Sequence, residues 1–253
     1  MLPILFNVGP FAVHAYGFFV ALAFLVGSIT AVYFAKREGI GSETVLDLAI
    51  YVVISAVVGA RLFYVFLYDW EYFRQNPIEI IMVQKGGLVF LGGMSLSIVV
   101  VAIYARLRNI SMLKLYDAIA PGMLLGQAIG RSGCFLNGCC FGIPTKFPWG
   151  VIFPAGSDAA AYFPGQPLHP VQIYTSLAML LAFLLLVWIY RFKKFDGQIF
   201  FWGLILYSAY RFMDEFLRVD PRWMILSIAQ WMVIFTFAFG VWGLLRYRKK
   251  PGA

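Results

Sequence analysis

Long runs of apolar residues recur along the whole chain and restrict its fold more than any other feature. Several approach the ~20 residues that a helix needs to cross the hydrocarbon of a bilayer. In lipid, the backbone must satisfy its own hydrogen bonds, which favours helices. The sequence therefore predicts an all-α integral membrane protein with about seven transmembrane helices, in the runs 16–35, 45–67, 88–105, 115–130, 171–190, 199–216 and 224–245.

Composition supports this class. Hydrophobic residues make up 62% of the chain and charged residues only 13%, whereas soluble domains are about one quarter charged. The net charge of +8 could indicate nucleic-acid binding, but the basic residues lie in short clusters between apolar runs. That arrangement is typical of membrane topology, so we expect no nucleic-acid partner.

Lysine and arginine concentrate in alternate loops, and this bias predicts the orientation. The richer loops include Lys36, Arg37, Arg106, Arg108 and Lys193. The positive-inside rule places them and the C-terminus in the cytoplasm, with the N-terminus outside. We expect a single membrane domain over residues 1–253. A glycine- and proline-rich segment, 131–170, would lie on the outer side between the fourth and fifth spans, and the short fourth run would end inside the protein.

Residues 126–142 combine five glycines, all three cysteines and one arginine, Arg131. Glycines this dense let a backbone pass close to a ligand or adopt positive φ. An arginine at the mouth of an apolar segment needs an anionic partner. The stretch is therefore interpreted as a backbone cradle with one fixed positive charge, which suits a phosphate group.

Two further arginines lie within predicted spans, Arg61 and Arg211. Tyr207, Arg211, Glu215 and Arg218 follow at helical spacing and share one face. Arg211 and Glu215 could simply neutralise each other. Yet Arg61, Arg131 and Arg211 together exceed the nearby carboxylates, and the excess favours an anionic ligand, in a membrane most commonly a phospholipid headgroup.

The histidines and cysteines leave several alternatives open. His14 and His169 each stand where a span begins, and either is a candidate base or a hydrogen-bonded structural residue. The cysteines, Cys134, Cys139 and Cys140, could form a disulfide or hold zinc, but C-x-x-C spacing is absent. Free thiols that pack as small hydrophobes are favoured, so we expect no metal and no cofactor.

Residues 130–142 resemble the signature of the prolipoprotein diacylglyceryl transferases, G-R-x-G-N-F-x-N-x-E-x-x-G. The resemblance continues along nearly the whole chain, through motifs in the same order. They are Val8-Gly9-Pro10, His14, Tyr16-Gly17, Gly59, Arg61, Tyr64, Gly86-Gly87, Gly92-Gly93, the element His169-Pro170-x-Gln172-x-Tyr174, and residues 207–218. Members of this family have seven spans with the N-terminus outside.

The resemblance implies an enzyme of the bacterial inner membrane whose active site faces the outer, periplasmic side. Such enzymes transfer the diacylglyceryl group of phosphatidylglycerol to the lipobox cysteine thiol of a prolipoprotein signal peptide. A thioether forms and glycerol phosphate leaves. The implied partners are phosphatidylglycerol, the prolipoprotein and membrane lipid.

The resemblance also assigns roles to individual positions. Arg131 and Arg211 match the two functional arginines, Tyr16 and Gly142 match residues required for activity, and Glu215 matches a residue that supports the second arginine. The candidate catalytic residues are Arg131, Arg211, Tyr16 and His14. The candidate substrate-binding residues are Arg61, Asn137, Gly142, His169, Gln172, Tyr174, Tyr207 and Glu215.

Four polar positions of the family are changed in this chain. Leu91 stands at a histidine often proposed as the base, and Cys134, Cys139 and Thr175 replace an asparagine and two glutamates. Either the reaction needs no histidine here, which we favour because two arginines would stabilise a substrate thiolate, or the chemistry has diverged. The alternatives are a relative with another acceptor and a non-catalytic lipid-binding or transport protein.

Overall fold

The computed structural model describes residues 1–9, 11–68, 70–83, 86–219, 222–223 and 225–248. The predicted start of the last span at Met224 and the proline of the Val8-Gly9-Pro10 element lie outside these residues. The chain forms two compact units, residues 1–34 with 116–253, and residues 35–115. The predicted single membrane domain stays a prediction.

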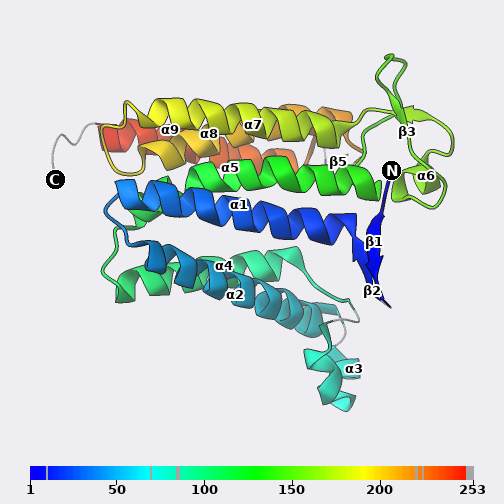
Figure 1. Cartoon of the computed structure of the whole chain (residues 1–253), viewed down its shortest axis with the longest axis horizontal. Helices are drawn as coiled ribbons and strands as arrows, with labels where there is room; N and C mark the ends of the chain where they lie inside the picture. Colours follow the sequence, from blue (N-terminus) through cyan, green and yellow to red (C-terminus); the bar gives the residue numbers. More distant parts are fainter. Residues whose placement is uncertain (10, 69, 84–85, 220–221, 224, 249–253) are drawn as a thin grey trace. The chain divides into compact units, whose positions relative to one another are not determined.

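The first unit contains helices that run alongside one another (Figure 1). The helix α8 (Gln198–Asp214) packs against both α7 (Val171–Tyr190) and α9 (Ile228–Arg248). Their apolar sequences carry few helix breakers, and most of their buried surface is aliphatic or aromatic. The helices are α1 (Ala15–Arg37) and α5 (Met112–Asn137), both of which cross the boundary between the units, α7, α8 and α9.

Three short antiparallel pairs of strands interrupt the helical pattern of this unit, and the all-α prediction did not contain them. They join β1 (Ile4–Val8) to β2 (Phe11–His14), β3 (Val151–Ile152) to β4 (Pro167–Leu168), and β5 (Arg222–Trp223) to β6 (Leu226–Ser227). The segment between α5 and α7 also holds α6 (Asp158–Tyr162). A small core of Phe153, Ala159 and Leu168 supports this segment, so its backbone is ordered by its own packing.

The second unit is built on α2 (Ser42–Tyr68) and α4 (Phe90–Leu107), with α3 (Trp70–Gln75) and the 3₁₀ turn η1 (Pro77–Ile81) between them. The two long helices approach closely through glycines. A Cβ added to Gly93 would lie 2.6 Å from the carbonyl oxygen of Ala56. Small residues at such crossings are typical of helix packing in membranes.

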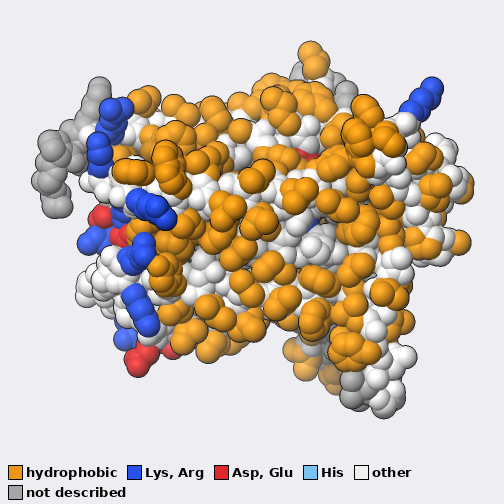
Figure 2. Space-filling view, turned by 45° about the horizontal axis from the view of Figure 1, so that its top comes forward, with side chains coloured by type: hydrophobic (Ala, Val, Ile, Leu, Met, Phe, Trp, Pro, Cys, Tyr) orange, Lys and Arg blue, Asp and Glu red, His pale blue; other side chains and the backbone are white. Residues whose placement is uncertain are grey.

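Four helices of the described residues, α1, α2, α7 and α9, are long and apolar enough to cross a membrane, and α4 contains a shorter apolar stretch, Leu91–Leu107. Large hydrophobic side chains cover much of the face seen in Figure 2. A soluble protein would rarely expose so much contiguous apolar surface. The chain is therefore a mostly helical membrane protein. The count of seven spans and the orientation of the termini stay predictions.

The helix α5 corrects the expected length of the fourth span. It begins at Met112, passes Pro121 and ends only at Asn137, so most of the glycine-rich stretch is helical and not a loop. The reason is packing against α1. Gly122, Gly126 and Gly130 recur every four residues, and a Cβ on Gly126 would lie 3.1 Å from the Ala23 carbonyl oxygen. These glycines admit a neighbouring helix, as small-xxx-small patterns do.

A buried carboxylate fixes the start of α8. Asp117 of α5 is 0% exposed. It accepts hydrogen bonds from the backbone N–H groups of Gly197 at 2.7 Å and Phe200 at 2.8 Å, and its Oδ2 lies 2.8 Å from the Lys193 ammonium. The carboxylate thus satisfies N–H groups that a helix start leaves without partners. This contact sets where the α7–α8 connection meets α5.

Candidate functional site

The C-terminal end of α8 carries a cluster of charged side chains. The Arg211 guanidinium forms an ion pair with Glu215 and lies 3.5 Å from an oxygen of Asp214. Both carboxylates are almost fully buried, and Arg218 reaches Asp214 at 4.0 Å. The Arg211–Glu215 pair that the spacing suggested is therefore present. Buried carboxylates of this kind need such partners, because an unpaired buried charge is costly.

Neutral side chains hold these carboxylates in place. The Tyr210 hydroxyl donates to Asp214 at 3.1 Å and lies 3.2 Å from the Thr175 hydroxyl. The Ser227 hydroxyl donates to Glu215 at 2.7 Å. Ser227 also accepts from the Gln230 backbone N–H, while the Gln230 side chain accepts from the Ser227 N–H. This reciprocal capping box at the start of α9 ties that helix to the charged cluster.

Arg131 differs from Arg211 in its partners. It lies six residues before the end of α5 and is partly buried. Its charge acts electrostatically on Asp214, Tyr210 and Tyr16, so it belongs to the same site. Within the part of the chain that the structure describes, it forms no hydrogen bond or ion pair. Arg211 and Arg218 thus pair with the two carboxylates, whereas Arg131 keeps its donors for an anion.

The start of α1 completes this side of the site. Tyr16 is 48% exposed and packs against α5 at Gly133, where an added Cβ would lie 2.8 Å from the Phe19 Cβ and 3.3 Å from the Tyr16 Cα. Gly133 follows Arg131 by two residues, so the close helix approach also sets the distance between Tyr16 and Arg131. His14 is exposed at the end of β2, with Nδ1 3.2 Å from the Ala12 carbonyl oxygen.

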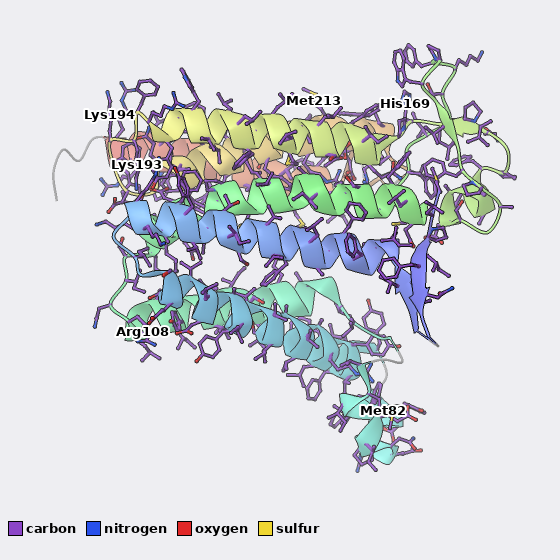
Figure 3. All side chains as sticks on the ribbon, viewed as in Figure 1. Met82, Arg108, His169, Lys193, Lys194 and Met213 are labelled. Carbon is purple, nitrogen blue, oxygen red and sulfur yellow. The ribbon has the colours of Figure 1, made fainter. Side chains whose placement is uncertain are left out.

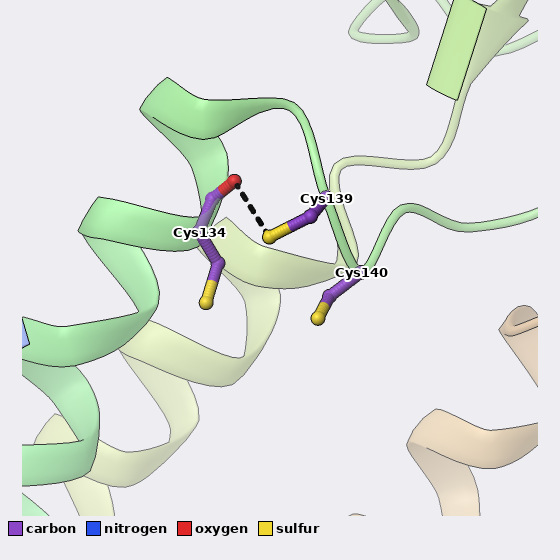
Figure 4. A group of neighbouring side chains, drawn as sticks. All are labelled: Cys134, Cys139 and Cys140. Atoms are coloured by element: carbon purple, nitrogen blue, oxygen red, sulfur yellow. Dashed lines mark hydrogen bonds between the residues drawn. The ribbon is translucent and has the colours of Figure 1, made fainter. Parts of the chain in front are cut away.

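The three cysteines converge where α5 ends (Figure 4). Their sulfur atoms all lie within 4.8 Å of one another, although their spacing in the sequence gave little sign of it. The backbone turns back after Gly138, whose φ is +75°, and Cys140 adopts the left-handed φ of 57° that residues with a Cβ rarely adopt. The Cys139 thiol donates to the Cys134 carbonyl oxygen at 3.7 Å.

Cys140 has the most polar surroundings of the three. A hydrogen bond from the Cys134 thiol stabilises its thiolate, and the charges of Arg218 and Arg131 act in the same direction, so the pKa of Cys140 lies below the ordinary thiol value. Burial opposes this shift but is the weaker effect. None of the thiols forms a disulfide.

The start of α7 borders the same region. The Gln172 side chain donates to the Cys139 carbonyl oxygen at 2.7 Å. Tyr174 accepts from the Trp149 indole at 2.7 Å and lies 3.2 Å from His169 Nδ1. Gly142 is wedged between strands of backbone, since an added Cβ would lie 2.8 Å from both the His169 and the Leu217 carbonyl oxygens. In Figure 3, His169 lies near one end of α7, and Lys193 and Lys194 lie near its other end.

The remaining predicted residues are less closely connected to the charged cluster. Asn137 is the last residue of α5, beside Cys139, and Tyr207 lies one turn before Arg211 on α8. Leu91 and Arg61 belong to the second unit. Leu91 is 52% exposed at the start of α4.

Arg61 is engaged by backbone rather than by carboxylates. Its guanidinium donates to the carbonyl oxygens of Ile80 at 2.9 Å, Glu79 at 2.6 Å, Gly86 at 2.6 Å and Gly87 at 3.1 Å. It is only 6% exposed, and it lies over the ring of Phe73. The contacts fasten the segment that follows α2 back onto that helix.

The sequence analysis did not predict three neutral residues that support the charged cluster, namely Tyr210, Ser227 and Gln230. A signal was available for two of them. Ser227-x-x-Gln230 just before an apolar run is the pattern of a capping box, and it would have placed the start of the last helix correctly. Tyr210 offers no such signal, because its partners come from α7 and from the end of its own helix.

Fold and site together define a helical membrane protein with a polar, arginine-rich site at one end of its helices. Comparison with known proteins identifies the family. Residues 3–246 match the family model described as prolipoprotein diacylglyceryl transferase, and the chain belongs to this family.

Relatives agree along most of their length. A phosphatidylglycerol–prolipoprotein diacylglyceryl transferase of Finegoldia magna is 36% identical over 237 residues, which cover 93% of this chain and 91% of the relative. The enzyme of the same name from Synechococcus elongatus is 36% identical over 250 residues, covering 96% and 86%. That from Bacillus cytotoxicus is 38% identical over 231 residues, covering 90% and 85%.

Proposed function

We propose that the protein is a transferase of lipoprotein biosynthesis. It moves the diacylglyceryl group of phosphatidylglycerol to the lipobox cysteine thiol of a prolipoprotein, forming a thioether and releasing glycerol phosphate. Membership of the family supports this reaction. The observation that carries it in this chain is Arg131, a partly buried guanidinium with no ion pair among the described residues, next to a cluster of charges that are already paired.

Arg131 is the residue that we assign to the phosphate of the donor lipid. In the reaction, the carbon–oxygen bond to the phosphate breaks and its electron pair stays on the phosphate oxygen. A preorganised guanidinium stabilises that developing charge, and a planar fork matches two phosphate oxygens. Asp214 and Glu215 hold Arg211 and Arg218 in fixed positions, so the field at the site is positive before the substrate arrives.

The attacking thiol belongs to the acceptor, and the thiolate is the nucleophile. Leu91 provides no base. The positive field of Arg131 and Arg211 favours the thiolate, since a nearby opposite charge stabilises the ionised form. Tyr16 and His14, at the start of α1, are the polar groups that we propose to border the acceptor. A proton released from the thiol ends on the glycerol phosphate.

The other predicted residues are assigned to binding and positioning. Gly142, His169, Gln172 and Tyr174 connect the segment after α5 to the start of α7, and Asn137 and Tyr207 lie on the helices that carry the two arginines. We propose a positioning role for Arg61, because four backbone carbonyl oxygens occupy its donors. A hollow of about 160 Å³ beside it is small for a lipid headgroup with its chains.

We also propose the topology that the sequence predicts. Seven helices would cross the inner membrane as one domain, with the N-terminus outside and the C-terminus in the cytoplasm. The basic residues Lys193 and Lys194 follow α7, whereas His169 precedes it, in agreement with an inner face near the lysines. The site at the start of α7 and the end of α5 would then open to the outer side.

Transfer of labelled phosphatidylglycerol to a lipobox peptide tests this function. Membranes that contain the protein should form a labelled thioether, and a peptide with serine in place of the lipobox cysteine should not become labelled. Transfer to another acceptor but not to the lipobox cysteine would indicate a diverged enzyme. Lipid binding without any transfer would indicate a non-catalytic lipid-binding or transport protein.

A further inference from the structure

The cluster of Cys134, Cys139 and Cys140 has the composition and geometry of a metal site. A tetrahedral zinc site with bonds of about 2.3 Å places its sulfur ligands roughly 3.8 Å apart. The three sulfur atoms here already lie within 4.8 Å of one another. Side-chain movements of about an ångström would therefore close the site. Thiolate ligands select soft or borderline ions such as Zn²⁺ over Mg²⁺ or Ca²⁺.

The backbone conformation around the three cysteines favours a dedicated binding site over incidental packing. Cys140 adopts a left-handed conformation, which a residue with a Cβ avoids and which concentrates at functional sites. This turn brings the neighbouring thiols of Cys139 and Cys140 to the end of the helix that carries Cys134 (Figure 4). Three thiols packed only as small hydrophobes would not need this conformation.

A buried amide supports the cluster from α7. Gln172 is 1% exposed, and its Nε2 donates to the Cys139 carbonyl oxygen at 2.7 Å. Its Oε1 has no hydrogen-bond partner among the described residues. Buried acceptors are normally satisfied, so this oxygen can accept from a further donor, such as a water bound to a metal ion.

Charge balance also fits a metal ion. Three thiolates and one Zn²⁺ carry a net charge of minus one, and the guanidinium groups of Arg218 and Arg131 act on Cys140. Three protein ligands leave the fourth tetrahedral position open, which is the arrangement of catalytic and not of structural zinc. The occupant of that position must be a small donor that can reach the outer end of α5.

We propose that Cys134, Cys139 and Cys140 bind a Zn²⁺ ion whose open position takes the cysteine thiolate of the acceptor prolipoprotein. This inference rests on the proposed function for the identity of that ligand, and it replaces the expectation that the protein binds no metal. A thiol that coordinates zinc loses its proton, so the ion would generate the nucleophile in a chain whose position 91 is leucine.

The step is balanced without oxidation or reduction. The acceptor S–H bond breaks on coordination, and its proton ends on the departing glycerol phosphate. The thiolate sulfur forms a bond to the glyceryl carbon while the bond from that carbon to the phosphate oxygen breaks. The thioether product is neutral and a weaker ligand than the thiolate, so it leaves the metal.

The metal content of the purified full-length protein tests the site independently of activity. Wild-type protein in detergent should retain about one zinc per chain, and Cys134→Ser, Cys139→Ser and Cys140→Ser should each lose it. His14→Ala removes an exposed possible ligand elsewhere and should keep the metal. Gln172→Ala retains all three thiols and should weaken zinc binding by about 10–100-fold. Protein without zinc, or an intact mass that shows a disulfide, would overturn the proposal.

The open position is tested with Co²⁺ in place of zinc in the wild-type protein, so no variant needs to fold. Sulfur-to-cobalt charge-transfer bands should appear, and a lipobox peptide should change them whereas its serine analogue should not. Unchanged spectra would rule out acceptor binding to the metal. Transfer that survives complete zinc removal would overturn the inference and leave the proposed function standing. Bound zinc together with no transfer activity would contradict the proposed function alone.

Discussion

At the scale of residues, the candidate catalytic arginines Arg131 and Arg211 have different surroundings, so their substitutions should have different effects. Arg211 is paired with Glu215 and Asp214, so its removal leaves buried carboxylates without a partner. Loss of one member of a buried pair costs about 3–5 kcal/mol of stability. Arg131 has no such pair among the described residues. Its substitution therefore tests the chemistry with less risk to the fold.

We expect Arg131→Gln to lower kcat about 10²–10³-fold, because it removes one charged donor from the developing phosphate. Arg131→Lys should recover little, since an ammonium group cannot form the planar fork. The measurement is transfer of labelled phosphatidylglycerol to a lipobox peptide, with thermal melting as a check on folding. Arg108→Gln is the control, because that side chain is 60% exposed and pairs with Asp47 at 3.6 Å. Wild-type turnover of Arg131→Gln would remove Arg131 from the site.

Leu91 bears on whether the reaction needs a base at the corresponding family position. Leu91→Ala should keep measurable turnover, because the side chain is 52% exposed and provides no proton acceptor. Leu91→His should not accelerate transfer by the ~100-fold typical of a gained general base. Both variants are compared with wild type in the same transfer assay across pH. A wild-type protein without activity and an active Leu91→His variant would show that the chemistry has diverged.

Some of the site was visible in the sequence and some was not. The helical spacing of Arg211, Glu215 and Arg218 predicted their shared face, because local periodicity determines it. The convergence of the cysteines was not predictable from spacing, since it depends on where α5 ends and on the left-handed turn at Cys140. Arg61 looked like a ligand for an anion, yet its partners are carbonyl groups 18 to 26 residues further along the chain.

At the scale of elements, the apolar runs predicted where the long helices lie. The glycine-rich stretch, however, led to a wrong prediction of where one of them ends. A run of glycines can mean a loop or a close helix crossing, and single-sequence reasoning cannot separate the two without the partner helix. In α5 the partner is α1, and the helix continues to Asn137. The strands β3 to β6 were missed because strands of two residues carry no periodic pattern.

The crossing of α1 and α5 provides a matched pair of substitutions one turn apart. Gly133→Ala should destabilise the protein by about 1–3 kcal/mol, because its Cβ would lie 2.8 Å from that of Phe19. Gly130→Ala should be neutral or mildly stabilising, since its nearest neighbour, the Ala23 Cβ, is at 3.8 Å. Thermal unfolding in detergent measures both. Equal melting temperatures for the two variants would contradict a close approach at Gly133.

The connection between α7 and α8 should depend on Asp117. Asp117→Asn removes the negative charge opposite Lys193 and weakens the cap on two backbone N–H groups. We expect a loss of about 1–3 kcal/mol, the cost of an unsatisfied buried polar group. Asp196→Asn is the control, because Asp196 approaches the same lysine at 3.7 Å but its side chain is 41% exposed. A control as unstable as Asp117→Asn would show that burial of Asp117 does not matter.

At the scale of the whole molecule, the chain combines a first unit that contains most of the candidate site with a second unit that holds Arg61 and Leu91. The sequence resemblance spans both units, and the motifs of both units occur in the same order as in the family. Membership of the family rests on residues 3–246 and thus includes both. The central claim is that the chain is an active transferase despite the changed positions at Leu91, Cys134, Cys139 and Thr175.

The most direct measurement of that claim is genetic complementation with a biochemical readout. A bacterial strain depleted of its own prolipoprotein diacylglyceryl transferase expresses the full chain, and the lipoprotein precursor is followed by mass spectrometry. Growth should recover, and the precursor should gain one diacylglyceryl group on its lipobox cysteine. Arg131→Gln, expressed at the same level, should restore neither. Abundant wild-type protein in the membrane with an unmodified precursor would contradict the account.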